Sequence, residues 1–343
     1  MNGASEKAVI VEHLSKNFEV TEKKPGILGS IFSLVSPQKK VIRALKNISF
    51  TIDKGELVGF IGANGAGKTT TLKILSGLLY PTSGFVQVSD FDPWQRRTEF
   101  LRQIALVMGQ KNQLWWDLPG IETMELNRAI YEIPKRQYQE SLEELTTLLE
   151  VKNLLNIQVR RLSLGQRMRL ELVAALIHRP KMLFLDEPTI GLDVIAQKKV
   201  RDFIYDYNKR FQATIILTSH NMGDLIDLTK RVIVIDKGET LFDGGLKELV
   251  GQYSKQKIIK VYLSKEADFK KFEEIGKISK LDFPLVTLSV PREASTLAAS
   301  EILQNFPVAD LTIEEEGVEE IIRRVFKGER IGKKPKMEKA TKN

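Results

Sequence analysis

The sequence contains no cysteine among its 343 residues. This absence excludes disulfide bridges, thiolate catalysis and cysteine-bound metal clusters, and it fits a reducing compartment. No run of about 18 apolar residues is free of charge, so we expect no transmembrane helix. The apolar run near the N-terminus is too short and too broken for a signal peptide. If the protein works at a membrane, another chain must span it.

Positive charge exceeds negative charge, with 52 Lys and Arg against 44 Asp and Glu and a formal net charge of +8. A basic balance permits nucleic acid, an anionic membrane surface or phosphate ligands, and does not choose among them. The length is sufficient for one large domain and a small one.

Strands and helices alternate over residues 1–250, which predicts an α/β fold. Residues 182–185 and 214–217 are short apolar runs bounded by polar residues, as buried parallel strands are. Residues 251–329 have a different pattern, with strand-like alternation at 257–263 and 285–290 and helix-like segments at 293–305 and 318–326. This pattern predicts a small α+β domain. Residues 330–343 are rich in lysine and are predicted to be disordered.

A glycine-rich loop, GANGAGKT at residues 62–69, is the strongest chemical motif. Its glycines let successive backbone N–H groups face an anion, and the helix expected from residue 68 adds its positive end. In this pattern Lys68 reaches the β- and γ-phosphates and Thr69 ligates Mg²⁺. The strand expected before it and the helix expected after it disfavour a chance turn. The expected nucleotide-binding residues are Gly62, Asn64, Gly65, Gly67, Lys68, Thr69 and Thr70.

Two carboxylates, Asp186 and Glu187, end the buried strand in the string LFLDEP at residues 183–188. Beside a phosphate loop they are interpreted as the metal and water half of a hydrolase. Asp186 would hold Mg²⁺, directly or through water, and Glu187 would polarise the attacking water. The alternative is a pair of solvated turn carboxylates.

A second glycine motif, LSLGQ at residues 162–166, opens another helix. Ser163 and Gln166 fit a capping box, and the helix start beside Gly165 is also an anion site. Both interpretations can hold together. A second anion site is surplus within one subunit, so we expect it to cover a nucleotide held by a partner in a head-to-tail pair.

Three further residues are ambiguous when taken alone. His220 follows the strand ending near residue 218, Gln110 follows residues 104–108, and Phe18 lies at the end of the first expected strand. A lone histidine after a strand is more often structural than functional. Phe18 is either a core residue or a ring that stacks on adenine.

The order of these motifs resembles the ATP-binding subunits of ABC transporters. Gln110 is followed by LSLGQ, LFLDEP, GLD at residues 191–193 and TSH at residues 218–220. The resemblance covers roughly residues 8–250. It implies an ABC-type P-loop nucleotide-binding domain, with a mixed sheet core and a helical subdomain at about residues 111–178, followed by the small C-terminal α+β domain.

The resemblance also implies roles for single residues. Gln110 would sense the γ-phosphate and Mg²⁺ and link to a membrane subunit, so the Mg²⁺ set is Thr69, Gln110 and Asp186. Ser163, Gly165 and Gln166 would close over the partner's ATP. Asp193 would bridge the dimer, His220 would contact the γ-phosphate, and Phe18 would stack on adenine. Glu187, His220 and Gln110 are thus the expected catalytic residues.

One position departs from the family pattern LSGGQ, because Leu164 replaces a glycine. If the backbone there needs a positive φ, leucine is strained. If the position is an ordinary helix start, glycine would be the worse residue. We favour the second hypothesis, with Leu164 making an apolar contact.

These motifs predict an ATP-binding and ATP-hydrolysing subunit of a transporter. The wording around LSLGQ and LFLDEP is similar to multidrug and sodium-efflux-like exporters of bacteria. The expected partners are membrane permease subunits and a second copy of the chain, with no specific nucleic acid, at the cytoplasmic face of the cell membrane. An importer ATPase, or a soluble ATPase acting on a ribosome or nucleic acid, is the alternative. The single cassette and the short interval between Gln110 and Ser163 disfavour the latter.

Two segments keep open alternatives. Residues 21–40 interrupt the first two strands with an apolar run flanked by four lysines. They are either a solvated loop or an amphipathic segment that rests on the permease or the anionic inner leaflet. Residues 114–118, LWWDL, are either subdomain core or a groove that receives the permease.

Overall fold

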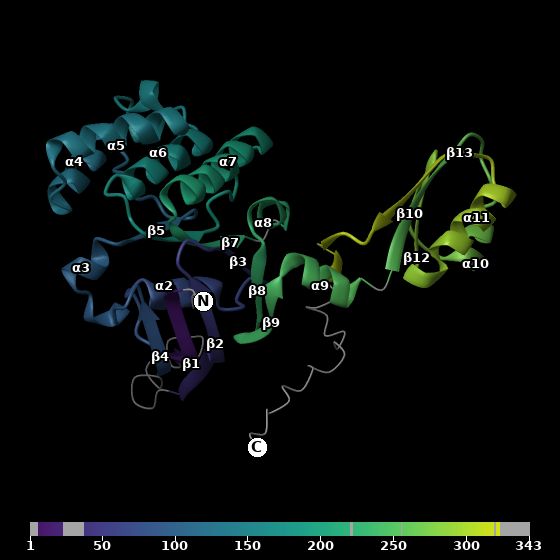
Figure 1. Cartoon of the computed structure of the whole chain (residues 1–343), viewed down its shortest axis with the longest axis horizontal. Helices are drawn as coiled ribbons and strands as arrows, with labels where there is room; N and C mark the ends of the chain where they lie inside the picture. The colour runs from purple at the N-terminus through teal and green to yellow at the C-terminus, as the bar shows by residue number, and fades with distance from the viewer. Residues whose placement is uncertain (1–5, 23–37, 220–221, 255, 319, 323–343) are drawn as a thin grey trace, which may run out of the picture. The chain divides into compact units, whose positions relative to one another are not determined.

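The computed structural model describes residues 6–22, 38–219, 222–254, 256–318 and 320–322. The chain divides into two compact units, Met1–Leu246 and Lys247–Asn343 (Figure 1). The division lies within helix α9 (Leu246–Tyr253), a few residues before the boundary expected at 250. Within the described ranges, no helix is long and apolar enough to cross a membrane.

Six strands form the main sheet of the first unit, in the order β5-β6-β7-β3-β8-β9. The first five run parallel and β9 is antiparallel to β8. Parallel strands are covered on both faces, so their sequences are continuously apolar. The strands are β3 (Leu57–Gly62), β5 (Ile104–Met108), β6 (Met182–Asp186), β7 (Thr214–Ser219), β8 (Arg231–Asp236) and β9 (Glu239–Gly245).

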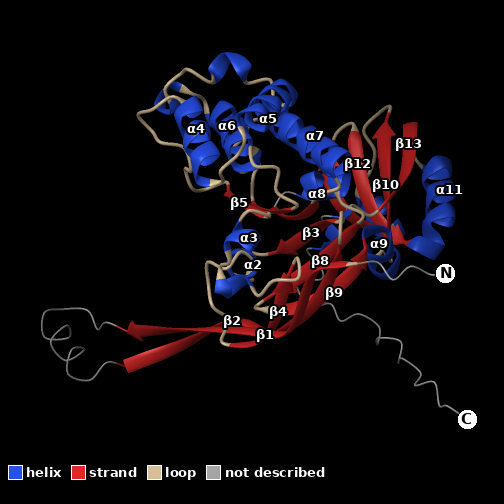
Figure 2. Cartoon of the chain, turned by 60° about the vertical axis from the view of Figure 1, so that its left-hand side comes forward, coloured by secondary structure: helices blue, strands red, loops and turns tan. Residues whose placement is uncertain are grey.

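A second, antiparallel sheet has the order β2-β1-β4. Its strands are β1 (Lys7–Glu22), β2 (Gln38–Asp53) and β4 (Ser83–Val88). β4 pairs with β1 only as far as Ser15, whereas β1 and β2 stay paired up to Glu22 and Gln38. Residues 16–22 and 38–45 therefore form a two-stranded ribbon that extends beyond the rest of the sheet (Figure 2). These strands are longer than expected and include both ends of the expected insert, whose residues 23–37 lie outside the described ones.

The core of this unit lies between the two sheets and includes α2 (Lys68–Leu75). The helix ends at Leu75, and Gly77 takes a φ of +74° close behind it. One cluster of buried side chains joins the two sheets to α2; examples are Val9, Phe50, Phe60, Leu72 and Phe184. The phosphate loop is thus anchored at both ends by buried apolar structure.

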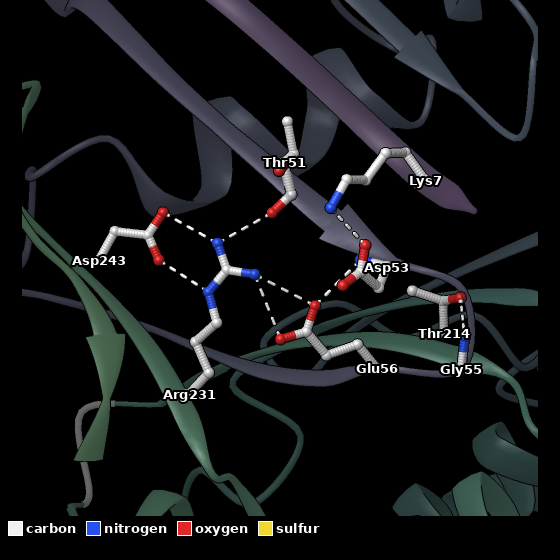
Figure 3. Close-up of polar contacts among 8 residues, drawn as sticks. All are labelled: Lys7, Thr51, Asp53, Gly55, Glu56, Thr214, Arg231 and Asp243. Carbon is white, nitrogen blue, oxygen red and sulfur yellow. Dashed lines mark hydrogen bonds and ion pairs between the residues drawn. The ribbon is translucent and has the colours of Figure 1, made fainter. Parts of the chain in front are cut away.

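Arg231, at the start of β8, connects the two sheets at the edge opposite the phosphate loop (Figure 3). Its guanidinium donates to both oxygens of Asp243 at 2.8 and 3.0 Å. It also donates to Glu56 at 3.2 Å and to the carbonyl of Thr51 on β2 at 2.9 Å. Because the guanidinium is planar and donates in several fixed directions, these hydrogen bonds hold the two sheets together and also fix their relative orientation.

Helices α4 (Gly120–Ile130), α5 (Lys135–Leu148) and α6 (Leu164–Leu176) form a helical subdomain between β5 and β6 in the chain. Within it α6 contacts both α4 and α5, and α6 also contacts β5 and α7 (Val194–Phe211) (Figure 1). The other helical elements of the first unit are η1 (Pro93–Gln95), α3 (Thr98–Leu101), η2 (Lys152–Leu154), η3 (Val159–Arg161) and α8 (Met222–Leu228).

The second unit has the succession β-α-β-β-α-β and the strand order β11-β12-β10-β13, with every pairing antiparallel. This is the ferredoxin-like, split β-α-β arrangement. Both helices contribute to one apolar core with one face of the sheet. The elements are β10 (Gln256–Leu263), α10 (Lys270–Ile275), β11 (Lys277–Asp282), β12 (Leu285–Pro291), η4 (Arg292–Ala294), α11 (Ser295–Asn305) and β13 (Val308–Glu315).

Candidate functional site

A cavity of about 500 Å³ opens where β3, β5 and β6 end. Parallel strands bring their carboxyl ends to one edge of a sheet, and ligands bind in the crevice outside that edge. The lining residues come from the phosphate loop and α2, from β2, and from the ends of β5 and β6 with the loops that follow them. They are Ala44, Ala63, Asn64, Gly65, Gly67, Lys68, Thr69, Thr70, Lys73, Met108, Gln110, Lys111, Asp186 and Glu187.

The phosphate loop has the geometry of an anion cradle. Gly65 and Gly67 take φ values of +81° and +111°, a region in which other residues are strained. α2 begins at Lys68, so the amides of its first turn have no partner within the helix. These N–H groups and the helix dipole favour a bound phosphate.

Lys68 is buried and lies across the loop. Its Nζ donates to the carbonyl of Gly62 at 2.6 Å and to that of Ala63 at 3.2 Å. Burial lowers the pKa of Lys68, and the nearby carboxylates of Glu187 and Asp186 oppose that change. A bound phosphate would add negative charge beside the ammonium and would favour its charged form further.

Asp186 connects the phosphate loop to β7. The hydroxyl of Thr69 donates to Asp186 Oδ2 at 2.7 Å, and that of Thr218 donates to Oδ1 at 2.7 Å. A hydroxyl, a carboxylate and the amide oxygen of Gln110 are hard oxygen ligands, which suit Mg²⁺. The described residues hold no cluster of three or more His, Cys, Asp or Glu that could bind a metal unaided. The donors therefore fit an ion that arrives with nucleotide phosphates, as Mg²⁺ commonly does.

Glu187 is positioned by its backbone. It has a φ of +53°, and its N–H is shared between the hydroxyl of Thr218 at 3.0 Å and the Thr218 carbonyl at 3.1 Å. Its Oε1 lies 3.9 Å from Lys68 Nζ, and Gln110 Nε2 donates to its Oε2 at 3.4 Å. The carboxylate therefore faces the cavity beside the ammonium that would bind the terminal phosphate, where it can accept a proton from water.

Gly109 lets the loop that carries Gln110 approach Glu187. The Gly109 N–H donates to the Asp186 carbonyl at 2.8 Å. A Cβ on Gly109 would lie 2.1 Å from the carbonyl oxygen of Glu187, closer than any side chain can come. Glycine at this position is what brings Gln110 within reach of Glu187.

The LSLGQ motif forms the predicted capping box at the start of α6. The N–H of Gln166 donates to Ser163 Oγ at 3.2 Å, and the N–H of Ser163 donates to Gln166 Oε1 at 2.9 Å. Leu164 is the first residue of α6, without a positive φ, and its Cδ2 lies 3.0 Å from where a Cβ on Gly191 would be. Asp193 caps α7 by accepting from Ala196 N–H at 2.8 Å. Ser163, Gly165, Gln166 and Asp193 are absent from the lining of the cavity.

The remaining candidates differ in outcome. Phe18 lies within β1 rather than at its end, is absent from the cavity lining, and has Lys16 Nζ 5.1 Å from its ring centroid. His220 lies outside the described residues. Trp115 and Trp116 are 52% and 49% exposed, so they are surface residues, whereas Leu114 is buried.

Sequence reasoning missed the role of Thr218 and the cavity positions of Ala44, Lys73 and Lys111. Thr218 stands in the TSH motif, two residues before His220. Its position one strand away from β6 could have indicated a hydrogen bond to Asp186, because β6 and β7 pair directly.

Comparison with known proteins matches this geometry. Residues 45–190 match the ABC transporter family model, and residues 255–314 match the EvrA-like ABC transporter C-terminal domain. The chain is 33% identical over 228 residues to the ABC transporter ATP-binding protein NatA of Bacillus subtilis. This match covers 66% of this chain and 92% of NatA. It is 32% identical to the bacitracin transport ATP-binding protein BcrA of Bacillus licheniformis, over 58% of this chain and 64% of BcrA.

The fold agrees as well. A dimeric, post-hydrolysis structure of the ATP-binding cassette MJ0796 with ADP and Pi superposes with a TM-score of 0.58 at 24% identity, over 69% of this chain and 98% of that one. Motifs, cavity and fold lead to one assignment: the chain belongs to the family of ABC transporter ATP-binding proteins and is an ABC ATPase.

Proposed function

We propose that two copies of this chain hydrolyse ATP in shared sites and drive a membrane permease, with export as the direction of transport. The main support is that the expected ATP-contacting residues lie in two separate places on the chain. The phosphate loop, the carboxylates and Gln110 meet in one cavity, whereas Ser163 is exposed and lies outside its lining. The positive end of the α6 dipole lies at this exposed helix start, which is suited to close over a partner's nucleotide.

The described residues divide the chemistry as follows. Lys68 and the loop amides bind the phosphates, and Thr69, Asp186 and Gln110 would hold Mg²⁺, which neutralises phosphate charge when bound. Glu187 orients the attacking water and accepts its proton. Gln110 contacts Glu187 and follows β5, so it responds to the γ-phosphate and to displacement of its own loop. His220 and Phe18 keep their proposed contacts with the γ-phosphate and adenine.

The surface around the signature motif supports a second copy as partner. Val194 and Ile195, directly after Asp193, are 77% and 72% exposed. Leu164 contacts Gly191 beside them, so the start of α6 and the GLD loop form one partly apolar face. Exposed apolar patches on soluble units mark interaction sites. In a head-to-tail pair this face covers the partner's phosphate loop, and Asp193 lies at the junction.

The surface around Trp115 and Trp116 is the proposed contact with the permease. Both rings are half exposed and follow Gln110 closely in the chain. Tryptophan is enriched at interface hot spots because it buries a large apolar area and keeps a polar atom. The chain would thereby sit peripherally at the cytoplasmic face of the membrane. Export rests on the resemblance of LSLGQ and LFLDEP to the multidrug and sodium-efflux-like subunits.

Mixed dimers test the shared site. Lys68→Ala removes the phosphate ligand, and Ser163→Arg places bulk where the partner's nucleotide would lie. Neither variant alone should trap nucleotide with vanadate. Mixed, each heterodimer has both lesions at one site and none at the other, so trapping should reappear. Ser300→Arg, on the exposed side of α11, is the matched control and should trap like the wild type. A mixture that traps nothing would mean that each subunit completes its own site.

A further inference from the structure

Glu171 is a buried carboxylate that the catalytic cavity does not use. It lies in the second turn of α6 and its side chain is 1% exposed. A buried carboxylate is costly unless charged or polar partners compensate it. The polar and charged groups around Glu171 should therefore indicate its role.

Two contacts connect Glu171 to the loop after Gln110. The backbone amide of Gln113 lies close enough to the Glu171 carboxylate to favour its charged form and lower its pKa, against the larger effect of burial. Arg167, one turn earlier in α6, has Nε 3.6 Å from Glu171 Oε1, and neither of these two atoms has a hydrogen-bond partner. The pair is an incomplete ion pair inside the subdomain, held by charge rather than by a hydrogen bond.

Arg167 continues the connection to the surface. Its guanidinium carbon lies 5.8 Å from the ring centroid of Trp116, within the range of a cation–π contact. The carbonyl of Trp116 accepts from the N–H of Arg160 at 3.0 Å, just before the signature motif. The tryptophan loop is thus attached to the chain on both sides of Ser163.

We propose that Glu171 is a positioning residue: its carboxylate holds Arg167 beneath Trp116 and the Gln113 amide against α6, so that the tryptophan surface and the signature motif move together, and its protonation loosens this connection. The proposal rests on the proposed function, because the signature motif matters only if it closes on ATP. Displacement of Trp116 by a partner would shift Arg160 and Arg167, which flank Ser163.

The charge environment supports this role. Burial raises the pKa of Glu171 to about 7, against the opposing effects of Arg167 and the Gln113 amide. β5 has no titratable side chain, and the buried faces of α4, α5 and α7 present only Tyr138 and Tyr207 as titratable groups. Burial raises the pKa of both phenols, so they stay neutral near pH 7. Arg167 is therefore the charged partner that decides whether Glu171 is ionised.

Trp116 fluorescence tests the connection without any ATP turnover. The chain has three tryptophans, so Trp94→Phe with Trp115→Phe leaves Trp116 as the only emitter. Its emission should titrate with a midpoint near pH 7, and Glu171→Gln should abolish that transition. Arg167→Gln should abolish it too while leaving Glu171 in place, and this covers the case in which Glu171→Gln fails to fold. Glu140→Gln, at an exposed position of α5, is the control and should retain the transition.

Nucleotide measurements on the full chain test the positioning role. Glu171→Gln should keep the wild-type affinity for ATP and lower vanadate trapping about 10-fold or more, because catalysis is sensitive to small misplacements. Loss of affinity in parallel with trapping, or a Trp116 titration that persists in Glu171→Gln, would overturn the proposal. A wild-type chain that binds ATP and traps none would instead contradict the shared-site function, while the fluorescence result would still stand.

Discussion

Glu187 and Gln110 show how single residues acquire a role from their neighbours. Glu187 takes a left-handed backbone at the end of β6, held by the Thr218 hydroxyl, and Gly109 gives Gln110 the space to reach it. Strained backbone at such a position persists because the surrounding contacts determine it. The side chain is thereby aimed into the cavity.

The first prediction concerns Glu187→Gln. The amide keeps the shape of the carboxylate and cannot accept a proton, so turnover should fall by about 10²- to 10⁴-fold. ATP affinity should persist because Lys68 and the loop amides are unchanged. With the γ-phosphate retained, a dimer should be visible by size-exclusion chromatography in ATP. Glu140→Gln serves as the matched control, and hydrolysis at the wild-type rate by Glu187→Gln would refute the base assignment.

The second prediction concerns Leu164. It begins α6 without a positive φ and contacts Gly191. Leu164→Gly should therefore lower the free energy of unfolding by about 1 kcal/mol from backbone freedom alone, and further through the lost contact. Leu164→Ala separates the two effects, since it removes the contact and keeps the helix former. A rise in melting temperature for Leu164→Gly would contradict the ordinary helix start.

At this scale the sequence predicted the positions of residues whose place depends on local order, while their roles stay predictions. The Ser163–Gln166 capping box follows from residues three apart, and Lys68, Thr69, Asp186 and Glu187 converge because each follows a parallel strand. Phe18 is different, because its place relative to the cavity depends on pairing between β1 and β2. Thr218 was missed because its hydroxyl acts across a strand pair that only the fold establishes.

Elements are set by packing as much as by sequence, and β1 and β2 show this clearly. The sequence predicted that the first strand ends near Phe18 and that residues 21–40 interrupt the first two strands. In the structure the two strands continue by pairing with each other up to Glu22 and Gln38. Register between distant segments is a tertiary property that propensity does not contain. The helical subdomain was predictable, because helical periodicity is local.

The third prediction concerns α6 and its end, where His178 is packed. Its ring stacks on Tyr131 with centroids 3.9 Å apart, and its Nε2 contacts the Ile104 carbonyl at 3.1 Å. Burial lowers the pKa of His178 from 6.5 to about 4. The folded state therefore holds the neutral ring. The contribution of His178 to the free energy of unfolding is fully present above pH 6.5. It is lost as the pH drops toward 4, which lowers the free energy of unfolding by up to about 3 kcal/mol.

His178→Gln should flatten this decline, because the amide donates to the same carbonyl and does not titrate. Urea unfolding between pH 4 and 7 measures the difference. Glu171 has a raised pKa of about 7, so its own contribution is lost as pH rises from 4.5 toward 7. Since Glu171 is present in both proteins, it cancels when the two curves are subtracted. Parallel curves for variant and wild type would exclude His178 as the cause.

The molecule as a whole consists of two units, and each has its own buried core. The second unit was predicted as α+β from the change in texture, but its strand order was not, because the order depends on which strands meet across the sheet. Units with separate cores unfold independently unless a large apolar interface couples them.

The fourth prediction separates the two units. Leu288 is fully buried in the second core, so Leu288→Ala should destabilise that unit by about 2–5 kcal/mol. Calorimetry should show that the unfolding transition of the second unit moves to a lower temperature, while that of the first unit stays where it is. ATP should raise the melting temperature of the first unit only. Leu72→Ala, in the first core, is the matched control and should shift the ATP-sensitive transition instead. A single transition that both substitutions lower would show that the units unfold together.

The ribbon of β1 and β2 has a practical consequence for handling the protein. Beyond Ser15, the described part of β1 pairs only with β2, and Phe18, Val20, Val41 and Ile42 are exposed along it. Open strand edges beside apolar side chains are templates for pairing with other chains, and lysines on the edge oppose it. Purified protein without its partners should therefore self-associate first through this ribbon. A high protein concentration, and salt that screens the lysines, should shorten the time for which a preparation stays monodisperse.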